Sequence, residues 1–310
     1  MRGARVILAS ALFALMAGAA LAQPAPRAVG PTIADAGSAF YRFEQVSVTS
    51  ADGARVYRIQ IAVPRKAAGA AGYPVAYLLD GDAAMARIDE ALLGQLDAGD
   101  PPVIVTVGYQ GDRQFDVLAR AYDYTPPVPD GAYVVDAAGR PGGGADAFLT
   151  LLHDQIAPLV AARVRIDVER SLLWGHSYGG LCVLHAALTR PDAYGRFVSV
   201  SPSLWWNYGS VLAEVDPFLT QPHPSNLSLT LLVGEEEVAG RGGRTRTNPM
   251  WSSVPSGATR DLAMRLHAAG VDVRFAELPG QAHGGMLAAS LIPTLLSFAG
   301  VAPAPGDALS

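Results

Sequence analysis

The sequence predicts an α/β fold in which helices cover both faces of a mostly parallel central sheet, preceded by an antiparallel hairpin. Residues 43–50 and 56–63 alternate apolar and polar side chains on either side of Ala51-Asp52-Gly53, which is typical of two hairpin strands. After the hairpin, short apolar runs alternate with segments of helical spacing. Strands and helices that alternate in this way form a parallel sheet covered on both faces.

The expected elements follow in chain order. Continuous apolar runs predict buried strands at 75–79, 103–107, 171–174, 197–200, 227–233 and 273–278. Apolar residues at helical spacing predict helices at 145–161, 181–188, 258–269 and 286–298. Residues 110–144 are polar, rich in proline and glycine and without clear periodicity, so we expect a long functional loop there.

The length allows one large domain. A chain of 310 residues can bury a full core as a single unit, which we expect at 39–302. Residues 23–38, rich in proline and alanine, are expected to be a flexible leader, and residues 303–310 a tail. In such a sheet, function collects at the carboxyl ends of the strands, and this rule selects the candidate site residues.

The N-terminal segment, residues 1–22, has the pattern of a secretory signal peptide. Two arginines precede a short apolar run, and Ala20-Leu21-Ala22 matches a signal-peptidase site. We expect this segment to be cleaved, which places the protein in the periplasm or outside the cell without stable membrane insertion. An uncleaved N-terminal anchor is the alternative.

Composition excludes several classes of function. Half of the residues are hydrophobic, 16% are charged and the net charge is −5, so the chain is globular and has no basic stripe for nucleic acid. Cys182 is the only cysteine, so an intramolecular disulfide is impossible, and its apolar setting predicts an inert core thiol. No zinc spacing, phosphate loop or dinucleotide motif is present, so we expect neither a metal nor a cofactor. The oligomeric state stays open.

Gly175-His176-Ser177-Tyr178-Gly179 matches the G-x-S-x-G pattern of a nucleophile elbow. It lies between a predicted strand and a predicted helix, which is the context that this motif requires. A serine on such a turn projects above the sheet, and the glycines leave room for its strained backbone. We therefore expect Ser177 to be a nucleophile, with the amide of Tyr178 pointing to the position of an oxyanion.

A serine nucleophile needs a base, and imidazole is the usual one near neutral pH. His283 follows the last predicted strand in a short loop bounded by glycines, where α/β hydrolases carry their histidine. His176 lies inside the elbow, where its side chain is too constrained to turn back to Ser177. The other histidines lie in predicted helices or in a proline-rich turn: His153, His185, His223 and His267.

The acid that orients the base should leave the strand at 227–233. Glu235, Glu236 and Glu237 follow that strand after a glycine, and the spacing favours Glu237, with Glu235 as runner-up. The other glutamates are expected to be solvated. A second oxyanion donor should come from the turn after residue 79, where the amide of Gly81 or Asp82 is the candidate.

Several longer motifs resemble the siderophore-esterase branch of the putative esterase group of α/β hydrolases. They span roughly residues 40–300 and comprise YPVAYLLDGDAAM at 73–85, the arginine and DYTPP at 120–127, GGGADAFL at 142–149, GHSYGGLCVLHAALTRPDAYGRF at 175–197, SPSLWW at 201–206 and the histidine loop at 280–284. Members of this branch open the trilactone ring of enterobactin and its glucosylated relatives. Some of them are expected to use a Ser-His dyad, so the resemblance leaves the role of Glu237 open.

The resemblance also implies substrate contacts. Arg120 matches the arginine of the family and is expected to bind substrate oxygens or assist the oxyanion site, with a loop salt bridge as the alternative. Trp205, Trp206 and Tyr208 follow a strand end, where they could wall an aromatic substrate, although core packing is the alternative for one tryptophan. Residues 241–256 lie outside the pattern of the family.

These observations predict a serine esterase that forms an acyl-enzyme at Ser177. The expected substrate is a small ester, a ferric catecholate siderophore lactone. A general carboxylesterase or acyltransferase is the alternative among enzymes, because the same groups serve other acyl esters. A non-catalytic siderophore-binding protein is the alternative of another class, although a binder has no need of both Ser177 and His283.

Overall fold

The computed structural model describes residues 27–128, 131–224, 226–239 and 248–302. These residues form one sheet of eight strands in the order β1-β2-β4-β3-β5-β6-β7-β8. The strands are β1 (Tyr41–Thr49), β2 (Val56–Pro64), β3 (Tyr73–Leu79), β4 (Val103–Tyr109), β5 (Ile166–His176), β6 (Arg196–Val200), β7 (Ser228–Gly234) and β8 (Val273–Leu278). The hairpin β1-β2 is antiparallel and β2 pairs antiparallel with β4, whereas β3 to β8 pair in parallel. The predicted fold class is confirmed.

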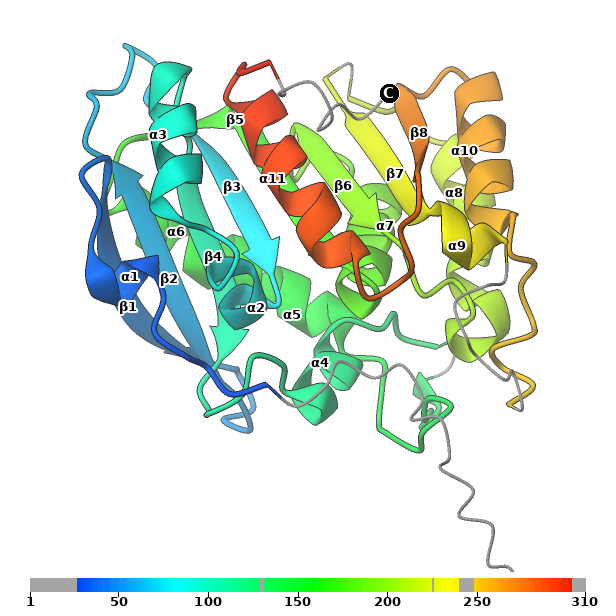
Figure 1. Cartoon of the computed structure of the whole chain (residues 1–310). Helices are drawn as coiled ribbons and strands as arrows, with labels where there is room; N and C mark the ends of the chain where they lie inside the picture. Colours follow the sequence, from blue (N-terminus) through cyan, green and yellow to red (C-terminus); the bar gives the residue numbers. More distant parts are fainter. Residues whose placement is uncertain (1–26, 129–130, 225, 240–247, 303–310) are drawn as a thin grey trace, which may run out of the picture.

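Helices cover both faces of the sheet (Figure 1). On one face, α2 (Gly81–Met85), α3 (Glu90–Ala98) and α11 (Met286–Phe298) enclose a core that includes Trp174. On the other face, the core lies beneath α5 (Ala145–Leu151), η2 (Leu152–Ile156), α6 (Ala157–Ala161), α7 (Tyr178–Thr189), α8 (Val215–Leu219) and α10 (Ala258–Ala268). The central strands are therefore buried on both sides, which is why they carry continuous apolar runs.

Several short helices were not predicted. They are α1 (Ile33–Ala36), α2, α3, α4 (Val117–Asp123), the 3₁₀ segment η3 (Trp206–Glu214), α8 and α9 (Glu235–Val238). The expectation of a loop throughout residues 110–144 is wrong, because α4 lies within it. The helix predicted at 145–161 is present, with one π-helical turn, η2, in its middle.

The flexible leader expected at 23–38 is only partly outside the described residues, and from residue 27 onward it is held to the domain. Arg27 accepts a hydrogen bond from the amide of Gln114, and Val29 donates to Asp112. Thr32 then caps α1 through the amide of Ala34. Residues 27–38 therefore contact the domain, whereas residues 23–26 lie outside the described residues. The signal-peptide segment and the tail lie outside the described residues.

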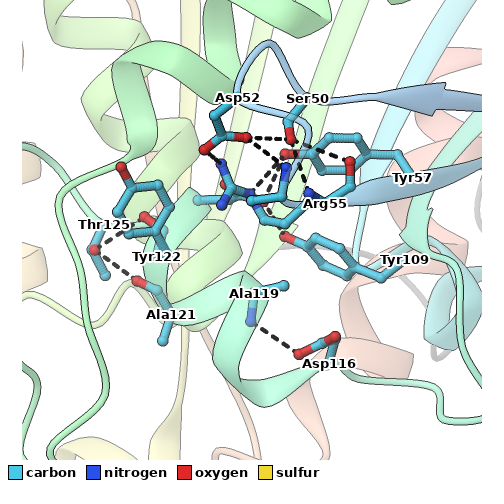
Figure 2. A network of polar contacts seen from close by, with 12 residues as sticks. Ser50, Asp52, Arg55, Tyr57, Tyr109, Asp116, Ala119, Ala121, Tyr122 and Thr125 are labelled. Carbon is cyan, nitrogen blue, oxygen red and sulfur yellow. Dashed lines mark hydrogen bonds and ion pairs between the residues drawn. The ribbon is translucent and has the colours of Figure 1, made fainter.

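A polar network joins the hairpin turn to α4 (Figure 2). The phenol oxygens of Tyr57 and Tyr109 donate to the buried carboxylate of Asp123, at 2.9 and 3.1 Å, and Arg55 pairs with the same carboxylate at 2.9 Å. Asp116 caps α4 by accepting from the amide of Ala119. The network fixes α4, the helix that carries Arg120, against the sheet.

Candidate active site

Ser177 occupies the sharp turn between β5 and α7. Its backbone lies at φ 63° and ψ −115°, a strained conformation for a residue with a side chain. A Cβ at Gly175 would lie 2.5 Å from the backbone of Gly179, and a Cβ at Gly180 would lie 2.4 Å from the carbonyl oxygen of Val200. Glycine is therefore required at Gly175, as the motif predicted, and also at Gly180, whereas a Cβ at Gly179 would make only ordinary contacts at 3.5 Å.

The structure brings His283 to Ser177 across 106 residues of chain. The Nε2 atom of His283 lies 3.0 Å from the Ser177 hydroxyl, and its Nδ1 atom lies 2.7 Å from a carboxylate oxygen of Glu237. With the Nδ1 proton donated to the carboxylate, Nε2 can accept the serine proton. The three predicted residues thus form a continuous relay at the carboxyl ends of β5, β7 and β8.

The geometry distinguishes the three glutamates that the sequence left open. Glu237 is the one that faces His283, and its other oxygen accepts hydrogen bonds from the Ser201 hydroxyl at 2.6 Å and the Gly234 amide at 3.0 Å. Burial alone would raise the pKa of Glu237, but the bonds from His283, Ser201 and Gly234 hold it at about 2. Glu237 is therefore ionised at neutral pH. Glu235 instead accepts from the amide of Gly280, in the histidine loop, at 2.9 Å.

The predicted oxyanion donors lie at the starts of two helices. Tyr178 is the first residue of α7 and Gly81 the first residue of α2, where backbone amides are free of helical partners. Asp80, before α2, adopts a left-handed backbone at φ 52°. Packing requires glycine at position 81, because a Cβ there would lie 2.6 Å from the backbone of β4.

Arg120 pairs with a carboxylate in the structure, which is the alternative that the sequence left open. Its side chain is buried and makes two parallel hydrogen bonds of 2.8 Å to the carboxylate of Asp80. The observed role is the alternative, a salt bridge, although it comes from α4 rather than from a loop. Since Asp80 precedes α2, this pair fixes the backbone next to the Gly81 amide.

The aromatic residues after β6 divide into three settings. Trp205 is partly buried, with its ring 5.6 Å from the ring of Tyr178 and 6.0 Å from that of Trp251. Together with Glu237 and His283 it lines a small cavity of about 100 Å³. Trp206 is fully buried in the core, so its predicted role in substrate binding is wrong. Tyr208 is 63% exposed and does not line this cavity.

Two serines next to the site were missed by sequence reasoning. Ser201, at φ 43°, bonds Glu237, and the Ser203 hydroxyl lies 3.4 Å from that of Ser177. Their place in the SPSLWW motif, directly after a predicted strand, was the available signal. Within the described ranges, no group of three or more His, Cys, Asp or Glu residues could hold a metal ion. In the same ranges, every helix is too short or too polar to span a membrane.

The fold and the relay define a serine hydrolase of the α/β-hydrolase class. The model of the family described as "Putative esterase" matches residues 50–298. The chain is 41% identical to the apo-salmochelin esterase of Escherichia coli (strain CFT073) over 282 residues, which cover 90% of this chain and 86% of that protein. It is 31% identical to the ferri-bacillibactin esterase BesA of Bacillus subtilis over 256 residues, which cover 79% and 83% of the two chains.

Solved structures agree with this assignment. The enterobactin and salmochelin hydrolase IroE superposes with a TM-score of 0.70 at 40% identity, covering 87% of this chain and all of the other. The same hydrolase has been solved in complex with DFP, with a TM-score of 0.69, 38% identity, and coverage of 87% of this chain and all of the other. The chain therefore belongs to the putative esterase family, in its siderophore-esterase branch.

Proposed function

We propose that this protein hydrolyses the ester bonds of a catecholate siderophore trilactone of the enterobactin or salmochelin type. The observation that carries the proposal is the Ser177-His283-Glu237 relay on a chain that is 41% identical to an apo-salmochelin esterase over most of both sequences. A non-catalytic binder would not need an ionised carboxylate, an imidazole and a strained serine in one line.

The chemistry follows from the geometry. As the Ser177 oxygen attacks the ester carbonyl, Nε2 of His283 accepts the serine proton, and the amides of Tyr178 and Gly81 or Asp82 hold the oxyanion. Collapse of the tetrahedral intermediate expels an alcohol, which takes that proton from His283 and leaves an acyl-enzyme. Water then gives a proton to His283 and attacks the acyl group, and His283 returns this proton to the Ser177 oxygen as the carboxylic acid leaves.

The chemistry of the site also suits an aromatic substrate. Trp205 and Trp251 wall the cavity beside Glu237 and His283, and aromatic rings favour tilted or offset packing with other rings. Residues 240–247 of the insert lie outside the described residues, but Trp251, which follows them, lines this cavity. The insert region thus contributes one wall beside the relay.

The place of action is part of the proposal. The pattern of residues 1–22 favours secretion to the periplasm, where cleavage of a ferric siderophore would weaken its hold on iron and permit release. A periplasmic fraction that lacks the protein, while the cytoplasm contains it, would contradict this part.

The test is hydrolysis of ferric and iron-free enterobactin by the protein lacking residues 1–22, followed by chromatography, beside p-nitrophenyl butyrate. We expect linear dihydroxybenzoylserine products from the parent protein and none from Ser177→Ala. Cleavage of the nitrophenyl ester alone would reject the siderophore substrate and leave a general carboxylesterase. If neither ester is cleaved, the proposal that the protein is an esterase is rejected.

A further inference from the structure

His176, the residue before the nucleophile, faces the loop that carries the base. It is the last residue of β5 and is 7% exposed. Its Nε2 atom lies 2.9 Å from the backbone carbonyl oxygen of His283, and the two imidazole rings are 4.9 Å apart between centroids, tilted by 44°. The sequence correctly excluded a contact with Ser177 but gave no indication of this one.

The contact fixes the protonation of His176. A carbonyl oxygen can only accept a hydrogen bond, so the imidazole of His176 carries a proton on Nε2 and is the hydrogen-bond donor. Burial, then the neighbouring His283 and Arg120, hold the pKa of His176 well below its ordinary value. His176 is therefore a neutral donor with one fixed tautomer.

We propose that His176 is a positioning residue for the base: through this hydrogen bond it sets the distance between the Ser177 oxygen and the imidazole of His283. His176 is covalently joined to Ser177 and donates to the backbone carbonyl of His283. The side chain of the same His283 returns to Ser177, with Nε2 3.0 Å from the serine oxygen, so the three residues form a short closed ring. The proposal rests on the serine-hydrolase chemistry proposed above.

The remainder of the histidine loop is held from the side of the acid. Glu235 accepts from the amide of Gly280, and the amide of Glu236 donates to the carbonyl of Gln281 at 3.1 Å. Gly234 leaves no room for a Cβ, which would lie 2.1 Å from that same carbonyl oxygen. These contacts end at Gln281. The carbonyl of His283 also accepts from the amide of Met286, at the start of α11, at 3.4 Å, so the shorter bond from His176 is the contact that ties this backbone to the nucleophile side.

The test compares His176→Met with His176→Gln. The two side chains have nearly the same length, but only glutamine offers an N–H at the position of Nε2. Since misplacing a catalytic group by about 1 Å can cost on the order of 100-fold, we expect methionine to lower kcat for p-nitrophenyl butyrate by about 10- to 100-fold with KM within about threefold. Glutamine should recover most of that loss. His153→Met, on an exposed helical position, is the control and should leave kcat unchanged.

Equal kcat for the methionine and glutamine variants, or no loss with methionine, would overturn the proposal. Thermal melting checks that each variant is folded at the assay temperature. If His176→Met does not fold, His176→Asn replaces it, because its amide is too short to reach the carbonyl and should show the same loss in kcat. The nitrophenyl ester requires only the relay, so this result stands whether or not ferric enterobactin is a substrate.

Discussion

Two histidines of this chain bind a glutamate through Nδ1 in almost the same way, yet their surroundings give them different tasks. His283 lies 2.7 Å from Glu237, and His185, on α7, lies 2.8 Å from Glu214. They differ at the other ring nitrogen. Nε2 of His283 meets the Ser177 hydroxyl, whereas Nε2 of His185 meets a second carboxylate, Asp146, at 3.1 Å.

The second partner decides whether the imidazole can exchange a proton. Burial alone would lower the pKa of His185, but Asp146 and Glu214 raise it to about 9, so this histidine is a cation at neutral pH and ties α7 to α5 and η3. His283 has a hydroxyl in place of the second carboxylate, so its Nε2 can accept a proton and return it. A histidine-carboxylate pair therefore indicates catalysis only when the remaining nitrogen is available.

The largest expected effect is at His283. His283→Ala removes the base, and kcat for p-nitrophenyl butyrate should fall by about 10⁴-fold or more, because serine and histidine act as one unit. The measurement is steady-state kinetics with a thermal melt as control. A folded variant with activity near that of the parent would mean that another group takes the serine proton.

The next effect is at Glu237. Glu237→Gln keeps the size of the side chain but removes the charge that orients the Nδ1 proton, so kcat should fall by about 10³- to 10⁴-fold. Glu235→Gln is the matched control, since an amide oxygen can still accept from Gly280, and it should stay within about threefold of the parent. Equal activity of Glu237→Gln and the parent would instead support a Ser-His dyad.

His185→Gln should separate stability from chemistry. Removing the cation leaves two carboxylates against a side chain that is 3% exposed, so the free energy of unfolding should fall by about 2–4 kcal/mol. The kcat at 25 °C should remain within about twofold, because His185 contacts none of the reacting groups. Urea unfolding and kinetics on the same sample give both values. An unchanged free energy of unfolding would refute the stabilising role of His185 between Asp146 and Glu214.

The contribution of His185 to stability should depend on pH. Its pKa is raised from 6.5 in the unfolded chain to about 9 in the folded protein, so the folded state binds the proton more tightly. The stabilisation is fully present below pH 6.5 and is lost as pH rises through about 9. The difference in unfolding free energy between the parent and His185→Gln, measured from pH 6 to 10, should shrink accordingly. A constant difference would contradict the assigned charge.

The smallest expected effect is at Ser201. Ser201→Ala removes one of the hydrogen bonds to Glu237 but leaves those from Gly234 and His283, at a cost of about 1 kcal/mol, or three- to tenfold in kcat. A loss as large as that of Glu237→Gln would show that Ser201 alone holds the carboxylate in place.

The parts of the fold that sequence predicted are those whose pattern is long or geometrically strict. The strands buried on both faces and the elbow at Ser177 were found because apolar runs and the glycine spacing have few alternative readings. Helices α2, α4, α8 and α9 have seven residues or fewer, too short to show helical periodicity. Asp116, which caps α4, was the available local signal.

The catalytic partners were predictable because chain order and strand ends restrict them. The direction in which a side chain points could not be predicted in the same way. Trp205 and Trp206 are neighbours in sequence, but the turn that starts η3 leaves one beside the relay and places the other in the core. Arg120 was marked by its motif, yet only the buried carboxylate of Asp80 shows that it points inward.

The measurement that tests this account most directly is the rate at which a fluorophosphonate modifies Ser177 in the parent, His283→Ala and His185→Gln proteins, with the modified residue located by peptide mass spectrometry. The account predicts rapid modification at Ser177 in the parent and in His185→Gln, and a loss of about 10³-fold or more in His283→Ala. Modification of His283→Ala at the rate of the parent, or of a serine other than Ser177, would contradict it.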